Sequence, residues 1–440
     1  MVRQVTAPSV ESRSGEDNPN HFLVQMPSSD PYMEANTSST EDEPNIARYS
    51  SSVDHDDRKI GLLFVIDCLN IGGTEKQLIE LIGRLDRKKF ALHLVCLRSS
   101  EYQQKLELDC DLVVLELPKL VSISGLRKLL SLSKYIRSRD IQVVQTFFID
   151  ANIVGTIAAR LAGASVVISS RREMVYWYTP MIMLSFRVLK HFTTRYLANS
   201  GNVRDYVSVK EGIPKDRIDV LYNGIDLSRF SASKDGRQFE IRKEIGAAPG
   251  VPIVGIVSNL NRPVKRVDVF LMAAAEVLER GLDAVFVIVG EGYLKEQLEG
   301  MGKALGIAGR LHFIGSKEDV VPYMQSFSIA VNSSESEGFS NAVLEYMACG
   351  VPVVATKFGG SSEAVVHGET GLLVEPNNHM EMAGAIIELL KDSQKAKKMG
   401  EHGRARVEGN FSFEVVVERQ QRYYADVLFQ TRVGKIGRVI

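Results

Sequence analysis

The 440-residue sequence has few cysteines, and their spacing predicts no disulfide framework. The four are Cys68, Cys96, Cys110 and Cys349, and no two form a Cys-x-x-Cys pair. Three of them lie within apolar stretches. Cysteine in that setting behaves as a small buried hydrophobic residue, as it does in proteins of reducing compartments.

Long apolar runs are also absent. No segment approaches the roughly 18 uninterrupted apolar residues that a membrane-spanning helix needs. The first twenty residues lack the apolar core of a secretory signal. We therefore expect a cytoplasmic protein.

Neither sign of charge dominates, because the formal net charge is −1. Residues 1–57 nevertheless hold eleven acidic residues and three arginines, a net charge of −8, so the rest of the chain carries +7. This balance does not favour nucleic acid as a partner, and the mildly basic body suits smaller anionic ligands or an anionic membrane face. Residues 1–57 also lack apolar periodicity, so we predict a disordered acidic tail.

From Lys59 onward, short apolar runs alternate with helical stretches. The runs are typical of parallel strands covered on both faces, and they fall at residues 60–66, 91–97, 112–115, 142–145, 165–169, 195–198, 218–221, 252–258, 284–289, 310–313, 328–332, 352–355 and 372–374. The pattern predicts an α/β protein with two doubly wound, Rossmann-like domains. We place them at 58–227 and 251–411, joined by a polar, irregular linker at 228–250 and followed by a C-terminal helix at 412–440.

Ligands of open parallel sheets bind outside the carboxyl ends of the strands. The first loop there contains Gly72 and Gly73, which let a ligand approach the backbone at a helix N-terminus and so favour an anion. It lacks the G-x-G-x-x-G spacing of nicotinamide-binding proteins. A second glycine-rich turn, Lys357–Glu363, is likewise suited to a phosphate. Taken singly, each loop also fits an ordinary turn.

Charged residues follow two strands of the second domain. Arg262 and Lys265 follow the first strand there and suit a diphosphate. Glu337 and Glu345 are eight residues apart, which on a helix returns to within about 80° of the same face. We expect Glu337 just before a helix and Glu345 about two turns inside it. Sugar hydroxyls would supply the hydrogen-bond donors that a partly buried Glu345 needs.

The stretch EGFSNAVLEYMACGVPVVATKFGGSSEAVVHGETGLLVEPN resembles the donor-binding half of glycosyltransferase family 4 (glycosyl transferases group 1). These are retaining enzymes of the GT-B fold, in which two Rossmann-like domains face each other across a cleft. The family's Glu-x7-Glu motif matches Glu337 and Glu345. LANSGNVRDYV and VLYNGIDLSRF resemble its interdomain segment, and IGGTEKQLIEL its N-terminal glycine loop. The similarity spans about residues 60–430.

The resemblance implies a role for each matching position. Lys265 contacts the donor diphosphate, Glu337 the transferred sugar, and Glu345 both ribose hydroxyls. Further donor-binding positions are Gly72 and Gly73 beside the phosphates, the backbone of Phe339, Ser340 and Asn341 beside the sugar or phosphate, and Gly290, Glu291 and Gly292 beside the base.

The sequence departs from the family pattern twice. Ser258-Asn259 replaces an arginine that many relatives carry, and we assign the later Arg262 to its role. Arg171-Arg172-Glu173 replaces a histidine near the acceptor. A guanidinium does not deprotonate and cannot act as a base, so we expect Arg172 to hold a phosphate or the acceptor.

The implied function is retaining transfer of a hexosyl unit from a nucleotide-diphosphate sugar, UDP favoured over GDP, to a glycan or lipid-linked acceptor in surface polysaccharide biosynthesis. Two Asp-x-Asp strings, residues 54–56 and 109–111, are not interpreted as metal sites, and no metal or other cofactor is expected. Another GT-B activity, such as a phosphorylase, and a non-catalytic nucleotide-sugar-binding protein are alternatives.

Residues 174–192, MVYWYTPMIMLSFRVLKHF, combine aromatic, Met and Leu residues with three basic ones. The stretch fits a core helix of the first domain. It also fits a surface that contacts the inner face of a membrane, which would place the protein peripherally there and favour a lipid-linked acceptor.

Overall fold

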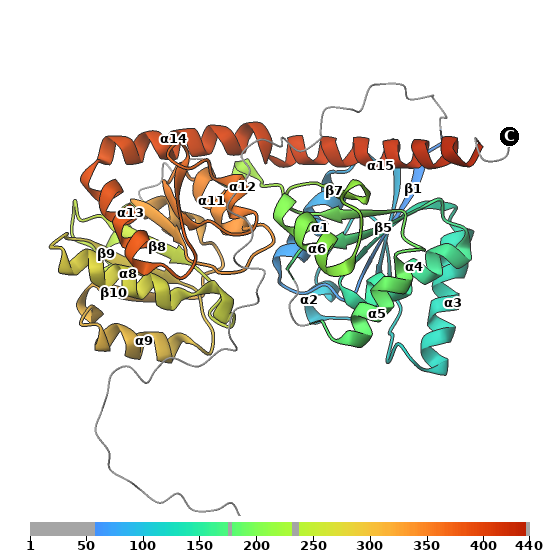
Figure 1. The fold of residues 1–440 in the computed structure, drawn as a ribbon, viewed down its shortest axis with the longest axis horizontal. Coiled ribbons are helices and arrows are strands. Elements are labelled where there is room, and N and C mark those ends of the chain that lie inside the picture. Colours follow the sequence, from blue (N-terminus) through green and yellow to red (C-terminus); the bar gives the residue numbers. More distant parts are fainter. Residues whose placement is uncertain (1–57, 175–177, 231–236, 437–440) are drawn as a thin grey trace, which may run out of the picture. The chain divides into compact units, whose positions relative to one another are not determined.

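The computed structural model describes residues 58–174, 178–230 and 237–436. The predicted acidic tail and its Asp-x-Asp string lie outside this part of the chain. The remainder contains two separate parallel sheets, each with helices around it (Figure 1). All thirteen strands expected from the sequence are present, displaced by at most a few residues at their ends. The prediction of two Rossmann-like α/β domains is therefore confirmed.

The first sheet has seven strands in the order β3-β2-β1-β4-β5-β6-β7. Its strands are β1 Ile60–Ile66, β2 Phe90–Cys96, β3 Asp111–Val114, β4 Ile141–Phe147, β5 Val166–Arg171, β6 Arg195–Ala198 and β7 Ile218–Val220. The helices between them are α1 Gly73–Arg84, α2 Glu101–Gln104, α3 Ile123–Ser138, α4 Ile149–Ala162, α5 Pro180–Leu189 and α6 Gly201–Glu211. The strand order reverses between β1 and β4, so the carboxyl ends of these two strands border a natural ligand position.

The second sheet has six strands in the order β10-β9-β8-β11-β12-β13. Its strands are β8 Ile253–Val257, β9 Val285–Val289, β10 Leu311–Gly315, β11 Ile329–Asn332, β12 Val353–Thr356 and β13 Gly371–Val374. Its helices include α8 Val267–Glu279, α9 Lys295–Ala304, α10 Val321–Ser326, α11 Asn341–Ala348, α12 Ser361–Ala364, α13 His379–Lys391 and α14 Ser393–Asn410. Here the order reverses between β8 and β11.

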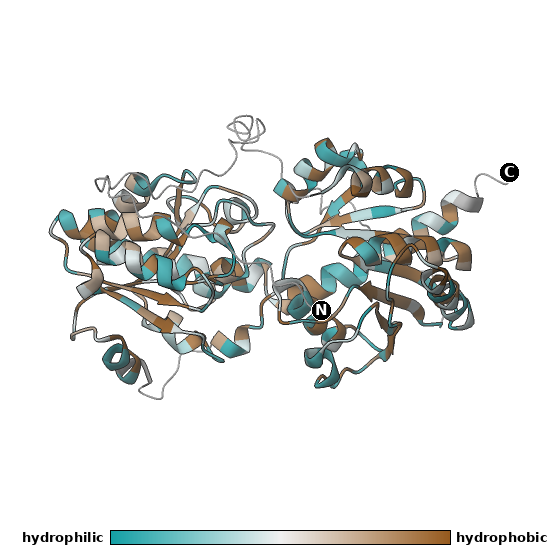
Figure 2. Ribbon diagram, turned by 90° about the horizontal axis from the view of Figure 1, so that it is seen from below, coloured by the Kyte–Doolittle hydropathy of each residue, from teal (hydrophilic) through white to brown (hydrophobic). Residues whose placement is uncertain are grey.

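Alternate residues along a strand point to opposite faces of the sheet, and each face is buried in its own hydrophobic core. The strand sequences are therefore continuous apolar runs. On β1, Phe64 belongs to one buried cluster and Val65 to another. On β9, Phe286 and Val287 divide in the same way. Figure 2 shows the strands as mostly hydrophobic and the helices as mixed, consistent with sheets buried on both faces and helices buried on one.

The last helix, α15 Phe413–Ile436, packs on the first sheet although it follows the second. Tyr424 lies in the cluster of Phe64 and Phe90, is fully buried, and donates a hydrogen bond to the side-chain oxygen of Gln145 on β4. The chain thus returns to its first half at its end (Figure 1).

The expectation of an irregular linker over 228–250 is wrong for part of that range. Residues 237–245 form helix α7, Arg237–Ile245. Ile241 and Ile245 are buried in the same cluster as strand residues of the second sheet. These two apolar residues, four positions apart, give the helix a buried face that the polar composition around them hides.

No helix within the described ranges is long and apolar enough to cross a membrane. The four cysteines are free thiols, with Cys96 buried and the other three half-buried. Burial raises the pKa of the Cys96 thiol to about 12, which makes it unreactive.

Candidate active site

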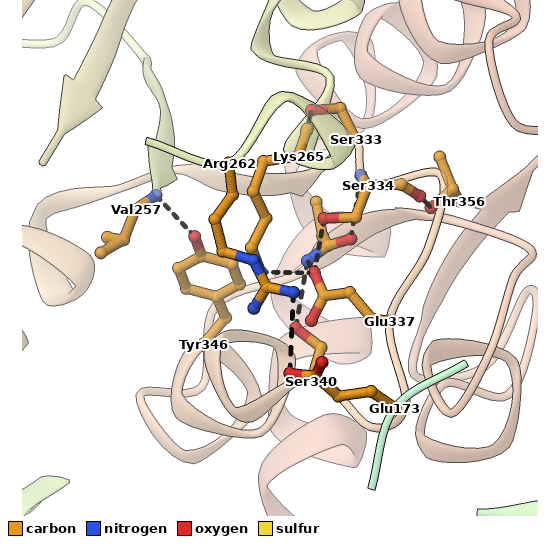
Figure 3. Close-up of polar contacts among 11 residues, drawn as sticks. Glu173, Val257, Arg262, Lys265, Ser333, Ser334, Glu337, Ser340, Tyr346 and Thr356 are labelled. Carbon is orange, nitrogen blue, oxygen red and sulfur yellow. Dashed lines mark hydrogen bonds and ion pairs between the residues drawn. The ribbon is translucent and has the colours of Figure 1, made fainter. Parts of the chain in front are cut away.

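Charged side chains gather where the second sheet reverses its strand order. The loop after β8 brings Lys265 and the loop after β11 brings Glu337, and Lys265 Nζ lies 2.8 Å from Glu337 Oε1 (Figure 3). Asn332 at the end of β11 and Ser334 also donate hydrogen bonds to Glu337 Oε1. Burial alone would raise the pKa of Glu337, but Lys265 and these donors lower it to about 2. The carboxylate is therefore ionised and fixed in position.

Hydrogen bonds join the loop after β11 to the backbone of the loop after β8. Ser333 Oγ donates to the carbonyl oxygen of Lys265 at 2.8 Å, and the N–H of Glu335 donates to the carbonyl oxygen of Val264 at 2.9 Å. Because Lys265 and Glu337 lie on loops held to each other, their relative position is set by the fold, as a positioned binding site requires.

Glu345 lies one turn inside α11, not two turns as the sequence spacing suggested, because the helix begins only at Asn341. The side chain is half-buried, and burial raises its pKa while the charges of Lys76, Arg229 and Lys265 lower it. In the described part of the chain no hydrogen bond ties this carboxylate to another side chain. It is available to a ligand that brings donors of its own.

Two of the predicted glycines lie where another backbone segment approaches closely, and a third faces a side chain. A Cβ on Gly290, whose φ is 141°, would lie 1.9 Å from the carbonyl oxygen of Ser258, and one on Gly292 would meet Leu260. Glycine there keeps the loops after β9 and β8 in contact. Gly73 begins α1, preceded by Gly72 as its N-cap, and a Cβ on Gly73 would lie 3.2 Å from the Asn341 side chain.

The segment from Phe339 to Asn341 is held by packing and by polar contacts. The ring of Phe339 lies 5.2 Å from that of Tyr222 and 5.6 Å from that of Phe411. Ser340 Oγ accepts a hydrogen bond from Asn332. The backbone at the start of α11 is thereby fixed beside Glu337. The glycine turn after β12 supports it, because Gly359 packs against the carbonyl oxygen of Glu337.

A polar chain joins Arg172 to Asn341. Arg172 donates to Asn223 Oδ1 at 2.6 Å and to Thr74 Oγ1 at 3.3 Å, and Asn223 donates to Asn341 Oδ1 at 2.7 Å. Burial lowers the pKa of Arg172 to about 10, so the guanidinium remains charged at neutral pH. Asn223 was not selected from the sequence, although it lies in the VLYNGIDLSRF stretch that carries part of the family resemblance.

Glu363 is a second residue that the sequence did not single out. Its carboxylate accepts from the backbone N–H groups of Gly201 and Asn202 and from the hydroxyl of Tyr222. A carboxylate at the first turn of α6 is favoured by the helix dipole. Glu363 thus connects the glycine turn after β12 to the first domain.

Arg262 contacts Glu173 instead of Glu337. Its Nη2 lies 3.7 Å from Glu173 Oε1, and both side chains are partly exposed (Figure 3). Glu291 pairs with Lys295 at 2.9 Å on the solvent side. Neither contact tests the role that the sequence assigned to Arg262 or Glu291. The described residues contain no cluster of three or more His, Cys, Asp or Glu side chains arranged to hold a metal ion.

Comparison with solved structures defines the class. The fold matches that of the Anabaena protein HepE, solved in complex with UDP, with a TM-score of 0.74, 22% identity, and coverage of 83% of this chain and 100% of that one. The chain therefore has the GT-B fold, with two Rossmann-like domains.

Sequence comparison gives the family. Residues 237–406 match the model "Glycosyl transferases group 1" and residues 71–229 match "Glycosyltransferase Family 4". The chain belongs to glycosyltransferase family 4. Relatives include N-acetyl-alpha-D-glucosaminyl L-malate synthase of Bacillus anthracis, 34% identical over 51% of this chain and only 57% of the relative's length. Another is a GDP-mannose-dependent monoacylated phosphatidylinositol monomannoside mannosyltransferase of Corynebacterium glutamicum, 28% identical over 79% of this chain and 93% of the relative.

Proposed function

We propose that this glycosyltransferase transfers a hexosyl unit, with retention at the anomeric carbon, from a nucleotide-diphosphate sugar to a glycan or lipid-linked acceptor. UDP is the favoured donor nucleotide, and surface polysaccharide biosynthesis is the favoured context. The observation that carries the proposal is the Lys265–Glu337 pair beside the carboxylate of Glu345, which has no hydrogen-bond partner among the side chains of the described residues. A lysine for the diphosphate, a fixed carboxylate for the sugar and a free one for the ribose are the groups such a donor requires.

In the proposed reaction the acceptor hydroxyl attacks the anomeric carbon on the face from which the diphosphate departs. The bond from the anomeric carbon to the diphosphate oxygen breaks, the bond to the acceptor oxygen forms, and the hydroxyl proton passes to the departing phosphate. Lys265, Arg262 and the N-termini of α1 and α11 stabilise the charge that develops on the leaving group. The reaction so written needs no metal ion.

The first experiment is thermal unfolding of the purified protein with UDP, GDP or ADP, each with and without Mg²⁺. A ligand at about 100 times its Kd stabilises the folded state by about 2.7 kcal/mol. We expect a clear increase in Tm with UDP that does not require Mg²⁺ and that disappears in Glu345→Ala. No increase with any nucleotide contradicts the proposal. A shift without turnover of any UDP-sugar favours the non-catalytic alternative.

We also propose a peripheral membrane contact through 174–192. Helix α5 is amphipathic: Phe186 and Leu189 are buried, whereas Met181, Leu184 and Val188 are 77%, 61% and 53% exposed. Arg187 is exposed on the same helix and the half-buried Lys190 follows its last residue, a composition suited to anionic lipid headgroups. Residues 175–177 of the segment lie outside the described ranges.

Flotation with vesicles tests the membrane contact. We expect the wild-type chain to bind vesicles containing phosphatidylglycerol and Met181→Asp/Leu184→Asp to bind them several-fold less, because the charges oppose insertion of the apolar face. Met380→Asp, at an exposed position on α13, is the matched control. Equal binding by all three proteins contradicts the proposal.

A further inference from the structure

The carboxylate of Glu363, on helix α12 of the second domain, accepts hydrogen bonds only from the first domain. Its Oε2 accepts from the backbone N–H of Gly201 at 2.8 Å and from the Tyr222 hydroxyl at 3.0 Å. Its Oε1 accepts from the backbone N–H and the side-chain amide of Asn202, at 2.9 and 2.8 Å. A carboxylate has about four acceptor sites, and these bonds fill them. Glu363 therefore has no acceptor site left for a substrate, and its role is not that of a catalytic residue.

Two of these bonds satisfy the start of α6. The first N–H groups of a helix have no partner inside the helix. In α6, Glu363 accepts from the N–H groups of Gly201 and Asn202, and the N-cap Ser200 accepts from that of Val203 at 3.1 Å. No ion pair joins Glu363 to a basic side chain in the described ranges. Its charge is therefore balanced by the positive end of the α6 dipole, which belongs to the other domain.

Tyr222 adds a donor from a second segment of the first domain. Its ring lies 5.2 Å from that of Phe339 and 5.5 Å from that of Phe411, and this packing holds the hydroxyl beside Glu363. Burial and the charge of Glu363 raise the pKa of Tyr222, so the hydroxyl keeps its proton and donates it to the carboxylate. Helix α6 and the segment after β7 thus meet at one carboxylate.

The backbone of Glu363 leads directly to the loop that carries Glu337. The N–H of Glu363 donates to the carbonyl oxygen of Gly360 at 3.1 Å, and the N–H of Gly360 donates to that of Gly338 at 2.9 Å. A Cβ on Gly359 would lie 1.9 Å from the carbonyl oxygen of Glu337. A displacement of Glu363 therefore moves backbone that packs on Glu337.

Further contacts fix this part of the chain from both domains. From the second domain, Arg406 donates to the carbonyl oxygens of Glu363 and Ala364, at 2.9 and 2.8 Å. From the first domain, Asn202 donates to the carbonyl oxygen of Gly359 at 3.0 Å. The start of α12 and the glycine turn before it are thus held between the two domains, with the carboxylate of Glu363 as the charged contact.

The relative position of the two domains matters because both contribute to the proposed donor site. Lys265 and Glu337 belong to the second domain, whereas the N-terminus of α1 belongs to the first, and a Cβ on Gly73 there would lie 3.2 Å from the Asn341 side chain. Groups that act on one diphosphate must keep their geometry, since a misplacement of about 1 Å can lower a rate about a hundredfold.

We infer that Glu363 is a positioning residue, whose bonds to the start of α6 and to Tyr222 hold the Glu337 loop in the position relative to the first domain that transfer requires. The inference rests on the proposed transferase function and adds to it a residue that contacts no substrate. It acts through the glycine turn and the backbone of Glu337.

Hydrogen–deuterium exchange of the full chain tests whether Glu363 holds the loop. Glu363→Gln keeps the size of the side chain, removes the charge and places an amide donor against N–H donors. We expect several-fold faster exchange at 201–204 and at 337–341, with exchange in α8 unchanged. Glu369→Gln, at an exposed position in the loop after α12, is the matched control. Unchanged exchange at 337–341, or an equal increase in α8, overturns the inference.

UDP release from UDP-glucose, UDP-galactose and UDP-N-acetylglucosamine tests the consequence for catalysis. For the donor that is turned over, we expect Glu363→Gln to lower kcat by roughly ten- to a hundredfold with little change in KM, because Lys265 and Glu345 both stay in place in the second domain. A raised KM with unchanged kcat overturns the inference.

Tyr222→Phe removes one donor to the same carboxylate and should lower kcat less. In the double variant with Glu363→Gln the two losses should not multiply, because both act through one contact. Losses that multiply independently contradict the role of Glu363. Absence of UDP release by the wild-type chain would instead contradict the proposed function, and the exchange result would then decide the inference alone.

Discussion

Two carboxylates, one in each domain, have opposite electrostatic settings. Glu337 is buried beside Lys265 and two side-chain donors, and its pKa falls to about 2. For Asp67, burial and the nearby Asp150 outweigh the backbone donors and Arg98, and its pKa rises to about 6. Lys265 neutralises the charge of Glu337, whereas Asp67 has no ion-pair partner among the described residues. The contrast indicates that the proposed donor site is built before a ligand arrives, whereas Asp67 would gain a partner only from a ligand.

The strongest test of the contrast is Lys265→Ala. The substitution removes the charge that we propose faces the diphosphate, and it leaves Glu337 buried without its cation. Loss of one such stabilising group costs roughly a hundred- to a thousandfold in kcat, and we expect a decrease of at least that size in UDP-sugar turnover. Lys395→Ala, in an exposed pair with Glu388, should keep full activity. Unchanged turnover in Lys265→Ala would show that the donor site has been misplaced.

The second test is Glu345→Ala. If this carboxylate accepts from the ribose hydroxyls, losing charge-assisted hydrogen bonds of about 1.5–3 kcal/mol should raise the Kd for UDP by roughly ten- to a hundredfold. Isothermal titration calorimetry measures this directly. Glu418→Ala, on the exposed side of α15, provides the control. A Kd equal to that of the wild type contradicts the ribose assignment.

The third test uses stability instead of activity. The pKa of Asp67 rises from 3.8 to about 6 on folding, so the folded state binds more protons between these values. Its contribution favours folding at low pH and is lost as pH rises through about 6. Asp67→Asn should therefore stabilise the protein at pH 7.5 by up to about 3 kcal/mol, and by less at pH 4.5. Equal effects of the substitution on Tm at both pH values would contradict a raised pKa of Asp67.

The sign is reversed for Glu337. Its pKa falls from 4.5 to about 2 on folding, so its contribution to stability is present above about pH 4.5 and is lost as pH falls through about 2. Glu337→Gln should thus destabilise the protein at pH 7.5. If the pKa of Asp67 is raised and that of Glu337 is lowered, Glu337→Gln lowers Tm at pH 7.5 and Asp67→Asn raises it.

The smallest expected effect is that of Arg262→Ala. Its pair with Glu173 is 3.7 Å long and partly exposed, and such pairs contribute about 0–1 kcal/mol to stability. We expect Tm in the absence of ligand to change little, while KM for the donor rises several-fold because the diphosphate loses a cation. A large loss of Tm without ligand would mean that Arg262 serves structure more than donor binding.

The two carboxylates also differ in how far the sequence predicted them. Lys265 and Glu337 follow buried strands in a pattern shared by the family, so their proximity could be anticipated. Asp67 is a single acidic residue at the end of β1, and its electrostatic setting depends on the backbone of α4 and on Arg98 pairing elsewhere. Those two contacts join residues 84 and 52 positions apart, which local patterns do not encode. Helix α7 was missed for a different reason, since only two of its residues carry the apolar signal.

Residue Tyr424 has a consequence for biosynthesis. Its ring packs edge-on against Phe64 and Phe90 at 6.4 and 6.1 Å, near the opposite end of the chain. During translation, these N-terminal aromatic residues leave the ribosome long before the helix that covers them. The core of the first domain is therefore complete only after α15 has been synthesised. A fragment that ends before α15 would expose the apolar residues that this helix covers, and we expect it to bind chaperones or aggregate.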